Sequence, residues 1–420
     1  MNRPVTAALL RVLPLLVVVS VIVLLPVGRA SELPLLIGAI AGIVLVARGR
    51  LPIFDPAVQL GSLLFACYWI PALLSAPMAV EPGKTWASVA AMLRFLPFLW
   101  FVAWALAGVS RAASAVTATG AVVALWVLDA YVQTAFGFGL GGSAESERVS
   151  GIFGADNLKL GPVLATLSPF LLVAAGARFG RVGMALAAAA MVVPVLLAGS
   201  RAAWLMYALV CVVFIWREAR SARRIALVLA GMALFVAVIA GVALRDSERF
   251  DARIERSLRA LDGSAAAIDE ASAGRLRIWH AALGMGLSHP LTGVGVRGFR
   301  HAYAEYAVPG DGFVDPKSGL GAAHAHQILL EAFSETGIVG VLGWFAAAVL
   351  AARAWRRAGP EARQRAIAPA TALLAMCFPV NTHLAFYSAW WGLLYAWLVA
   401  LYCASLAAPP RLCEGRSGIA

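Results

Sequence analysis

Twelve apolar runs, most of them close to the length of a bilayer-spanning helix, account for the greater part of this chain. A helix needs about 20 apolar residues to cross the hydrocarbon core of a membrane. Hydrophobic residues make up 61% of the chain and charged residues 13%, so most runs lack a polar face that could meet water. We therefore predict an all-α integral membrane protein with about 12 transmembrane helices. The predicted spans are 8–27, 33–47, 57–76, 86–107, 112–136, 159–176, 182–198, 202–216, 225–244, 327–351, 366–383 and 386–407.

The distribution of Lys and Arg predicts how the chain is oriented. Loops on the cytoplasmic side of a membrane carry an excess of these residues. With the N-terminus inside, most cations fall in cytoplasmic loops, and the short outer loops hold only Arg29, Lys84, Arg148, Lys159 and Arg201. The first run has no small-residue cleavage site, so we expect it to be retained as a span. We expect both termini in the cytoplasm and no nucleic-acid partner, because the net charge of +12 follows the topology.

One long polar segment interrupts the apolar pattern. It divides the chain into transmembrane helices over 1–244, an extracytoplasmic loop over 245–326, and transmembrane helices with a cytoplasmic tail over 327–420. A loop of this length is translocated whatever its charge. Apolar spacing and glycine content predict three helices and a mobile stretch within the segment. They are an amphipathic helix at 250–261, a helix at 274–288, a short aromatic helix from Phe299 to Tyr306, and the mobile stretch at 309–321. We expect this loop to close over a site at the membrane surface.

Arg201 stands where an inward-going helix is expected to begin, directly after Gly199 and Ser200. Ser200 is a plausible N-cap residue. A helix N-terminus carries a partial positive charge, so a cation is disfavoured there unless an anion binds to both. The alternative is an arginine that extends to the outer lipid headgroups. The spacing alone does not separate the two interpretations.

Four other cations are candidates for binding an anionic substrate. Arg275 and Arg277 stand at the head of the predicted helix at 274–288, where the alternative is a solvated helix face. Lys84 and Arg94 bracket the outer end of the fourth run. A cation inside an apolar run is costly and usually functional. The alternative for Arg94 is an ion pair with a buried carboxylate, for which Asp129 is the candidate.

His324 and His326 are two residues apart, next to the tenth run. No third metal-binding residue follows at a suitable spacing, so we predict no metal site. A helix terminus lowers the pKa of a histidine at its start, and a neutral imidazole can act as a general base. The alternative is that His326 is a polar residue that caps the helix. His383 and Tyr387 lie at the outer end of the last two runs and are expected to line the same cavity.

The chain contains no nucleotide-binding loop, and its five cysteines are scattered without a CxxC pair. We therefore predict no cofactor. A reaction outside the cytoplasm, without ATP, requires a substrate that is already activated.

Three motifs in this order resemble those of the O-antigen ligases, a family related to the O-antigen polymerases. The first is Gly199-Ser200-Arg201 at the start of a span. The second places Arg275 four residues before Trp279, with Pro290 to Gly295 downstream, and the third runs from His326 through Glu331 to Gly337. A weaker fourth motif spans Arg148 to Asn157. Gln327 departs from the pattern, because many relatives have asparagine at this position.

The resemblance implies a GT-C-like glycosyltransferase in the cell inner membrane, with one large, partly helical periplasmic loop. It would transfer a polysaccharide from undecaprenyl pyrophosphate to the lipid A–core oligosaccharide at the periplasmic face, among membrane lipids. Arg201 and Arg275 would stabilise the pyrophosphate, with Lys84 as a third candidate, and His326 would be the general base of a metal-independent, inverting displacement. The further substrate-binding candidates are Arg94, Arg148, Asn157, Arg277, His324, His383 and Tyr387.

Other functions remain open at this stage. A polymerase would use the same donor and differ only in its acceptor, and a protein-glycosylating relative is a third possibility. A transporter of lipid-linked glycans would belong to another class. Transporters often show inverted repeats and broken helices at the bilayer midplane. This sequence shows no internal repeat, and its unusual cations and histidines cluster at the outer surface.

Overall fold

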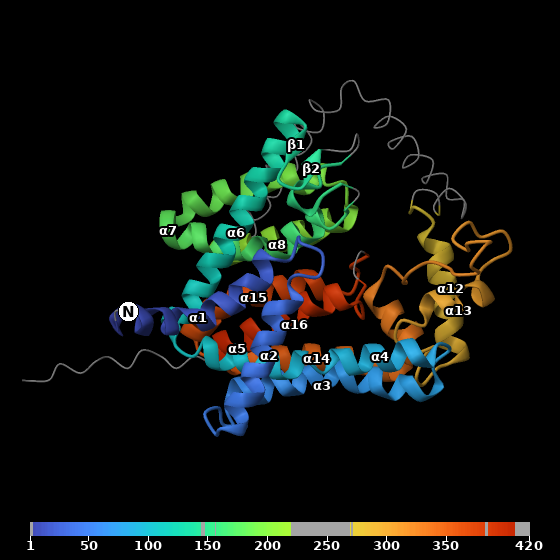
Figure 1. Cartoon of the computed structure of the whole chain (residues 1–420). Coiled ribbons are helices and arrows are strands. Elements are labelled where there is room, and N and C mark those ends of the chain that lie inside the picture. The colour runs from blue at the N-terminus through green and yellow to red at the C-terminus, as the bar shows by residue number, and fades with distance from the viewer. Residues whose placement is uncertain are drawn as a thin grey trace, which may run out of the picture.

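The computed structural model describes residues 3–143, 148–155, 157–219, 269, 272–382 and 385–407. This part of the chain is almost entirely helical, apart from a small antiparallel hairpin of β1 (Phe138–Gly139) and β2 (Gly142–Ser143). Figure 1 shows a bundle of long helices with α12 and α13 beside it. The helices are α1 (Arg3–Val23), α2 (Glu32–Ala47), α3 (Pro56–Ser75), α4 (Pro82–Met92), α5 (Phe95–Ala105), α6 (Val109–Phe136), α7 (Leu160–Leu197), α8 (Arg201–Ala219), α12 (Arg275–Ser288), α13 (Phe299–Tyr306), α14 (Ile328–Arg357), α15 (Pro360–Cys377) and α16 (Ala389–Ala407), with short 3-10 turns at Ala76–Met78 and Gly151–Phe153.

Helices occupy all of the predicted spans except 225–244, which lies outside the described residues together with the predicted amphipathic helix at 250–261. Among the described residues, 6 helices are long and apolar enough to cross a membrane. They are Pro56–Met78, Pro82–Ala105, Val109–Phe136, Leu160–Leu197, Ile328–Arg357 and Ala389–Ala407, and α1 and α2 carry shorter apolar stretches. The chain is therefore a multi-pass, all-α membrane protein.

Two of the predicted spans, 159–176 and 182–198, are the two arms of α7. This helix turns back at Gly180, which has non-helical angles of φ 67° and ψ −161°. A Cβ atom placed on Gly161 would lie 3.0 Å from the Cβ of Ala198, although these residues stand at opposite ends of the element. The arms are therefore antiparallel. The turn brings the beginning of α7 next to the beginning of α8.

α16 occupies the middle of the bundle. Its residues from Trp391 to Ser405 are all buried. Trp397 donates a hydrogen bond from its indole nitrogen to the carbonyl of Val18, at 2.8 Å, which joins α16 to α1. The hydroxyl of Tyr68 in α3 donates to the carbonyl of Phe386, just before α16, at 3.0 Å. The polar tips of these aromatic side chains are thus satisfied inside an apolar core.

α14 contains a sharp break at Gly337, which has φ 64° and ψ −160°. The break removes helical hydrogen bonds, and the segment from Pro290 to Val296 replaces them. Val294 donates its backbone N–H to the carbonyl of Ser334 at 2.8 Å, and Gly295 donates to Glu335 at 3.0 Å. Ile338 donates to the carbonyl of Pro290 at 2.8 Å. We call this set of contacts the α14 junction.

The same segment also contacts the corner between α3 and α4. Val80 donates its N–H to the carbonyl of Val294 at 2.9 Å, and the Thr85 hydroxyl donates to the carbonyl of Val296 at 3.0 Å. Val296 donates in turn to the hydroxyl of Ser75 at 3.3 Å. The segment that links α12 to α13 is therefore bonded to two separate helices of the bundle.

The two predicted helices of the polar segment that fall in the described residues are confirmed as α12 and α13. They enclose a small core of their own, which includes Ile278, Met285, Phe299 and Tyr303. The stretch predicted to be mobile is attached to this core, because the Tyr303 hydroxyl donates to Asp311 at 2.8 Å. Gly321 donates its N–H to the carbonyl of Arg300 at 2.8 Å.

The predicted partner of Arg94 is wrong. Arg94 lies between α4 and α5 and makes a bidentate ion pair with Glu32 at the start of α2, with distances of 2.7 and 2.8 Å. Asp129 instead accepts the backbone N–H of Leu140 at 2.6 Å. A bidentate pair of this kind neutralises both charges where they are shielded from water.

Gly337→Ala tests the α14 junction. A Cβ at this position would lie 2.3 Å from the backbone carbon and oxygen of Leu291, so α14 and the 290–296 segment would have to separate. We expect a marked fall in the thermal unfolding midpoint of the purified protein. An alanine forced to a positive φ alone costs about 1–2 kcal/mol.

Gly319→Ala is the matched control, because Gly319 also has a positive φ, of 68°, but no atom lies within 4 Å of its Cβ position. Gly319→Ala should lower the thermal unfolding midpoint by a smaller amount, because it forces an alanine to a positive φ without a steric clash. Equal shifts of the midpoint for the two variants would mean that the close approach at Leu291 contributes nothing.

Candidate functional site

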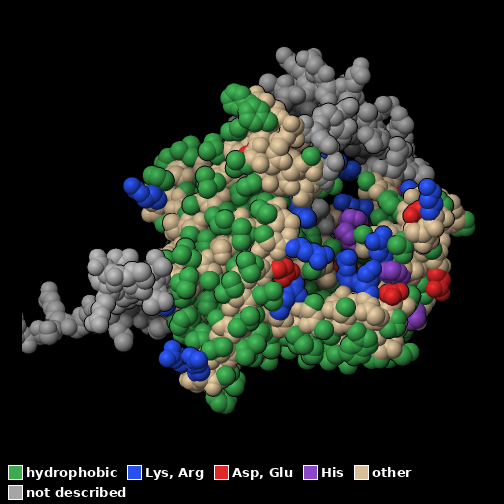
Figure 2. All heavy atoms as spheres, viewed as in Figure 1, with side chains coloured by type: hydrophobic (Ala, Val, Ile, Leu, Met, Phe, Trp, Pro, Cys, Tyr) green, Lys and Arg blue, Asp and Glu red, His purple; other side chains and the backbone are tan. Residues whose placement is uncertain are grey.

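Lys, Arg and His side chains gather in a hollow between the bundle and the α12–α13 part of the molecule. Figure 2 shows this hollow, whereas the surface of the bundle on the same face is mostly apolar. An apolar surface around a charged hollow is the arrangement expected where a membrane protein handles an ionic group at the edge of the bilayer.

The corner between α7 and α8 contributes Arg201 and Arg148. Gly199 turns the chain with φ 69°, and Ser200 accepts the N–H of Ala203 at 3.4 Å, which confirms Ser200 as the N-cap. Arg201 is then the first residue of α8 and is exposed. A Cβ on Gly199 would lie 3.0 Å from three side-chain atoms of Arg148. The glycine is therefore needed for Arg148 to lie against this corner.

Arg275, the first residue of α12, lies opposite this corner. Its Nη1 donates to the hydroxyl of Thr382 at 2.9 Å. Burial lowers the pKa of Arg275, and the positive charge of Arg201 lowers it further. Two guanidinium groups close enough to influence each other repel, and a bound anion would relieve this repulsion. Thr382 was not identified from the sequence, because nothing local links a threonine at 382 to an arginine at 275.

His326 lies within electrostatic reach of Arg275. Burial lowers the pKa of His326 to about 4, with Arg275 as the second cause. The lowered pKa was expected from a helix terminus, and the structure identifies burial as its largest cause. The Nδ1 atom has no hydrogen-bond partner among the residues that the structure describes. The ring packs on that of His324, with centroids 3.9 Å apart.

Gln327, and not His326, caps α14. Its side-chain oxygen accepts the N–H of Leu330 at 2.5 Å, and its amide nitrogen donates to the carbonyl of Pro379 at 2.7 Å. His326 precedes the cap with a φ of 52°, an uncommon conformation for a residue with a side chain. Strain of this kind persists only where the surroundings hold it, and it is frequent at functional sites.

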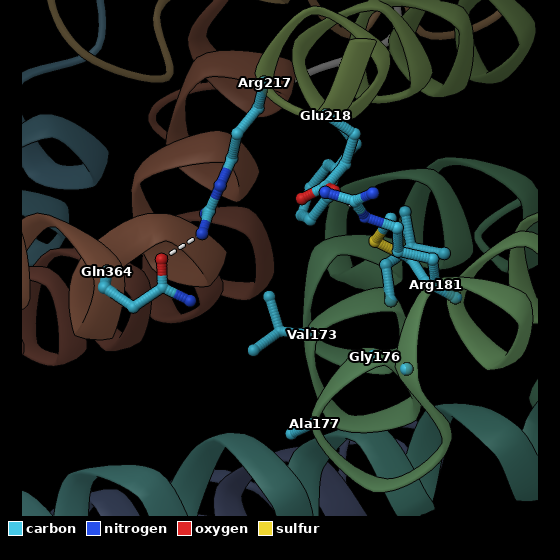
Figure 3. A pocket seen from close by; sticks show the side chains of 11 residues that line it. Val173, Gly176, Ala177, Arg181, Arg217, Glu218 and Gln364 are labelled. Carbon is cyan, nitrogen blue, oxygen red and sulfur yellow. Dashed lines mark hydrogen bonds and ion pairs between the residues drawn. The ribbon is translucent and has the colours of Figure 1, made fainter.

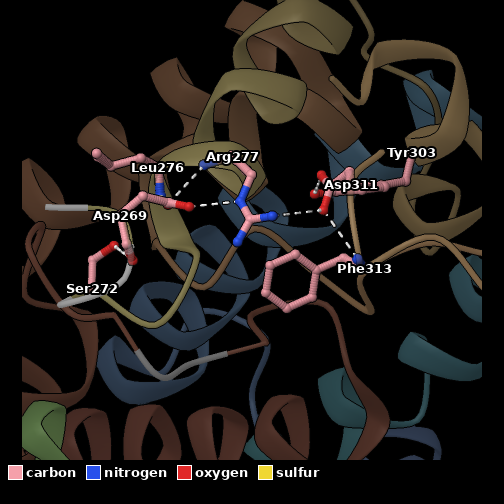
Figure 4. Close-up of polar contacts among 7 residues, drawn as sticks. All are labelled: Asp269, Ser272, Leu276, Arg277, Tyr303, Asp311 and Phe313. Carbon is pink, nitrogen blue, oxygen red and sulfur yellow. Dashed lines mark hydrogen bonds and ion pairs between the residues drawn. The ribbon is translucent and has the colours of Figure 1, made fainter. Parts of the chain in front are cut away.

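Arg277 has a different environment from Arg275, although only Leu276 separates them. Its Nε donates to Asp269 at 2.6 Å, and Nη1 lies 3.8 Å from Asp311. Its guanidinium also lies 5.6 Å from the centroid of the Phe313 ring. Figure 4 shows these partners around Arg277. Arg277 thus joins the start of α12 to the loop after α13, and its predicted contact with substrate stays a prediction.

The remaining candidates are distributed around the hollow and the bundle. Lys84 is exposed, and its Nζ lies 3.3 Å from Nε2 of His301 in α13. Asn157 stabilises its own turn, donating to the carbonyl of Phe153 at 3.1 Å. Tyr387 is buried and its hydroxyl is bonded to Thr336 at 3.0 Å. His383 lies outside the described residues.

Two buried carboxylates in α14 received no role from the sequence. Glu331 and Glu335 are each only 1% exposed. Glu331 accepts the N–H of Tyr387 at 3.2 Å, and Glu335 accepts the N–H of Arg297 at 3.0 Å. They hold the segments before α16 and α13 against α14. The described residues contain no group of three or more His, Cys, Asp or Glu that could hold a metal ion.

A cavity of about 320 Å³ between α7, α8 and α15 does not belong to this site. Figure 3 shows Arg181 paired with Glu218, at 2.9 Å, and Arg217 hydrogen-bonded to Gln364 at its edge. Arg217 lies near the end of α8, whereas Arg201 begins it. At 1.5 Å per residue, the two are roughly 24 Å apart along the helix.

Thr382→Val tests whether the hydrogen bond at 2.9 Å positions Arg275 for an anion. The substitution keeps the shape of the side chain and removes the acceptor. We expect inorganic pyrophosphate to bind the purified protein roughly fivefold more weakly, which corresponds to about 1 kcal/mol for one hydrogen bond. Thr382→Ser keeps the hydroxyl and should bind like the unchanged protein. Equal affinity of the valine variant would show that Arg275 needs no support from Thr382.

The comparison with known proteins bears on the same residues. A family model described as O-antigen ligase matches residues 186–345. The matched range contains Arg201, Arg275 and His326, and it covers the second arm of α7, α8, α12, α13 and the break in α14. No curated protein matches the chain. The match over residues 186–345 confirms the resemblance that the motifs predicted, and it supports assignment of this part of the chain to the O-antigen ligase family.

Proposed function

We propose that this protein transfers a polysaccharide from undecaprenyl pyrophosphate to the lipid A–core oligosaccharide, at the periplasmic face of the inner membrane. The proposal rests on one observation above all. Arg201, Arg275 and His326 come from three distant segments, and Arg275 lies within electrostatic reach of both of the others. The O-antigen ligase family supports an activity of this type.

In this proposal, Arg201 and Arg275 stabilise the diphosphate, which is the leaving group of the donor. When the bond between the sugar and the diphosphate breaks, the electron pair stays on the phosphate oxygen, so negative charge develops there. Fixed cations aimed at that charge lower the barrier more than a proton donor would, because a diphosphate is a weak base. Arg201 and Arg275, which lie within reach of each other's charge, would supply these cations, and Arg148 lies at the same corner as Arg201.

In this proposal, His326 is the general base that activates the acceptor. Its neutral ring takes the proton of the attacking sugar hydroxyl, while the hydroxyl oxygen forms a bond to the anomeric carbon. Attack from the side opposite the diphosphate inverts that carbon in one step, without a metal. Retention of the donor configuration in the product would contradict this step.

The charge of the donor and the basicity of His326 are linked. Arg275 lowers the pKa of His326 in the free protein. A diphosphate bound to Arg275 offsets that charge, so the pKa of His326 rises towards its usual value only when the donor is present. The base is thus strengthened in the complex that needs it.

The variants Arg201→Gln, Arg275→Gln and His326→Gln test the assigned roles. In a strain that lacks its own copy of the gene, each should reduce polysaccharide-capped lipopolysaccharide by about 100-fold or more, at normal protein level, because each removes charge stabilisation or the base. Long chains should accumulate on undecaprenyl pyrophosphate. Lys317→Gln, an exposed cation of the same part of the molecule, is the control and should keep full ligation.

The same strains distinguish the competing functions. If deletion leaves lipopolysaccharide capped with a single repeat and produces no long chains on the carrier, the protein is a polymerase. An unchanged profile after deletion would favour a transporter or an unrelated role.

The pH dependence of the reaction gives an independent test of His326. With a pKa of about 4 in the free protein, His326 is neutral and competent at every pH well above that value. We expect kcat/KM for the donor, which reports the free enzyme, to stay level from neutral pH down to about 5 and to fall only below it. A fall centred near 6.5 would contradict the burial of this ring, provided that activity returns when the pH is restored.

A further inference from the structure

A second group of basic side chains lies where the start of α13 meets α4. We call it the α13 cluster, and it consists of Lys84, Arg297, Arg300 and His301. Lys84 and His301 are in contact at 3.3 Å. Burial and the charges of Lys84, Arg300 and Arg297 lower the pKa of His301, so these cations lie within electrostatic reach of it, while Glu81 acts in the opposite direction.

The charges of this cluster are not balanced within it. Its acidic neighbour at the surface is Glu81, whose carboxylate lies 3.9 Å from His301. Glu335 accepts the backbone N–H of Arg297 at 3.0 Å, but it is buried in α14. Arg297 also lies within electrostatic reach of the buried Glu331 and Glu335. The excess positive charge at the surface therefore comes mainly from Lys84 and Arg300, and a bound anion would stabilise them.

Arg300 provides a second, independent observation. Its Nε is buried and has no hydrogen-bond partner within the described part of the chain. Buried donors are almost always satisfied in folded proteins, and an unsatisfied one calls for an explanation. A phosphate group beside Arg300 would supply the acceptor.

The cluster is held rigidly, as a binding site requires. Arg297 directly follows the segment of the α14 junction and has a φ of 64°, which fixes its direction. Lys84 precedes Thr85, whose hydroxyl is bonded to Val296 at 3.0 Å. Residues from α4 and from the start of α13 are therefore locked together by the junction.

The cluster is also tied to the proposed base. The carbonyl of Arg300 accepts the N–H of Gly321 at 2.8 Å, and Gly321 begins the short stretch that leads to His324 and His326. The donor cations Arg201 and Arg148 belong to the corner between α7 and α8 instead. His326 is thus connected to the α13 cluster through the backbone, while Arg275 is the cation within its electrostatic reach.

We infer that the α13 cluster binds a phosphate group carried by the acceptor glycolipid, and that Arg201, Arg275 and Arg148 bind the diphosphate of the donor. This assignment rests on the proposed function. It moves Lys84 from the donor to the acceptor. Arg297, Arg300 and His301 receive a role in choosing an acceptor that bears phosphate.

The test uses the full-length protein in nanodiscs, with phosphorylated acceptor glycolipid and with the same glycolipid after phosphatase treatment. Binding of each acceptor and its transfer kinetics are both measured. In the unchanged protein, we expect the phosphorylated acceptor to bind roughly tenfold more tightly, as for the loss of one charge-assisted contact. In Lys84→Gln and Arg300→Gln, this preference should disappear, while KM for the donor stays within twofold. Lys317→Gln should retain the preference.

Each other outcome has a distinct meaning. An increase of KM for the donor in Arg300→Gln, or equal weakening of both acceptors, would overturn the inference in favour of a donor or structural role. If the preference depends on phosphatidylglycerol in the nanodisc, the cluster binds bilayer headgroups and the inference is wrong. If the phosphorylated acceptor binds more tightly but no polysaccharide is transferred, the α13 cluster binds phosphate as inferred and the proposed ligase function is wrong. If polysaccharide is transferred equally to both acceptors, the ligase function stands and the inference about the α13 cluster is wrong.

Discussion

The exchange of hydrogen bonds at the break in α14 is the contact on which the rest of the site depends. Inside a membrane protein, backbone groups released by a broken helix must find new partners. The segment from Pro290 to Val296 provides them for Ser334, Glu335 and Ile338. This works only because Gly293 and Gly337 allow two backbones to approach within the space that a Cβ would fill. The break therefore fixes α12 and α13 against the helix that begins just after His326.

The second constraint is electrostatic. Arg201 and Arg275 lie close enough to repel, and Arg275 also disfavours the charged form of His326. This arrangement costs folding free energy, and it would leave His326, the base that we propose, weakly basic until an anion binds. An anion placed between the cations removes the repulsion and strengthens the base together. One bound diphosphate would thus assemble the site and activate it, so that the base becomes effective only when the donor is ready.

The sequence predicted the features that depend on local pattern. Apolar length located the helices of the bundle, and the Gly199-Ser200-Arg201 order located the start of α8 and its cap. Partners far apart in sequence could not be predicted. Nothing near Arg94 indicated Glu32, and nothing near Arg275 indicated Thr382. Arg275 and Arg277 looked alike from their neighbours, yet two helical positions differ in direction by roughly 200° about the axis. One therefore faces Thr382 and the other Asp269.

In the reaction that we propose, two anionic substrates would meet at one base and repel each other, and a single cationic centre would not hold both in a reactive order. Separate cations on separate scaffolds resolve this problem. Arg148 and Arg201 belong to the corner between α7 and α8. The α13 cluster is held by the segment of the α14 junction, to which α4 is bonded next to Lys84. Because the His326 segment is joined to the second scaffold through Gly321 and Arg300, movement of the acceptor side would move the base with it. An acceptor held by its own phosphate would then present its hydroxyl to the base in a fixed direction, which is the geometric requirement for an efficient displacement.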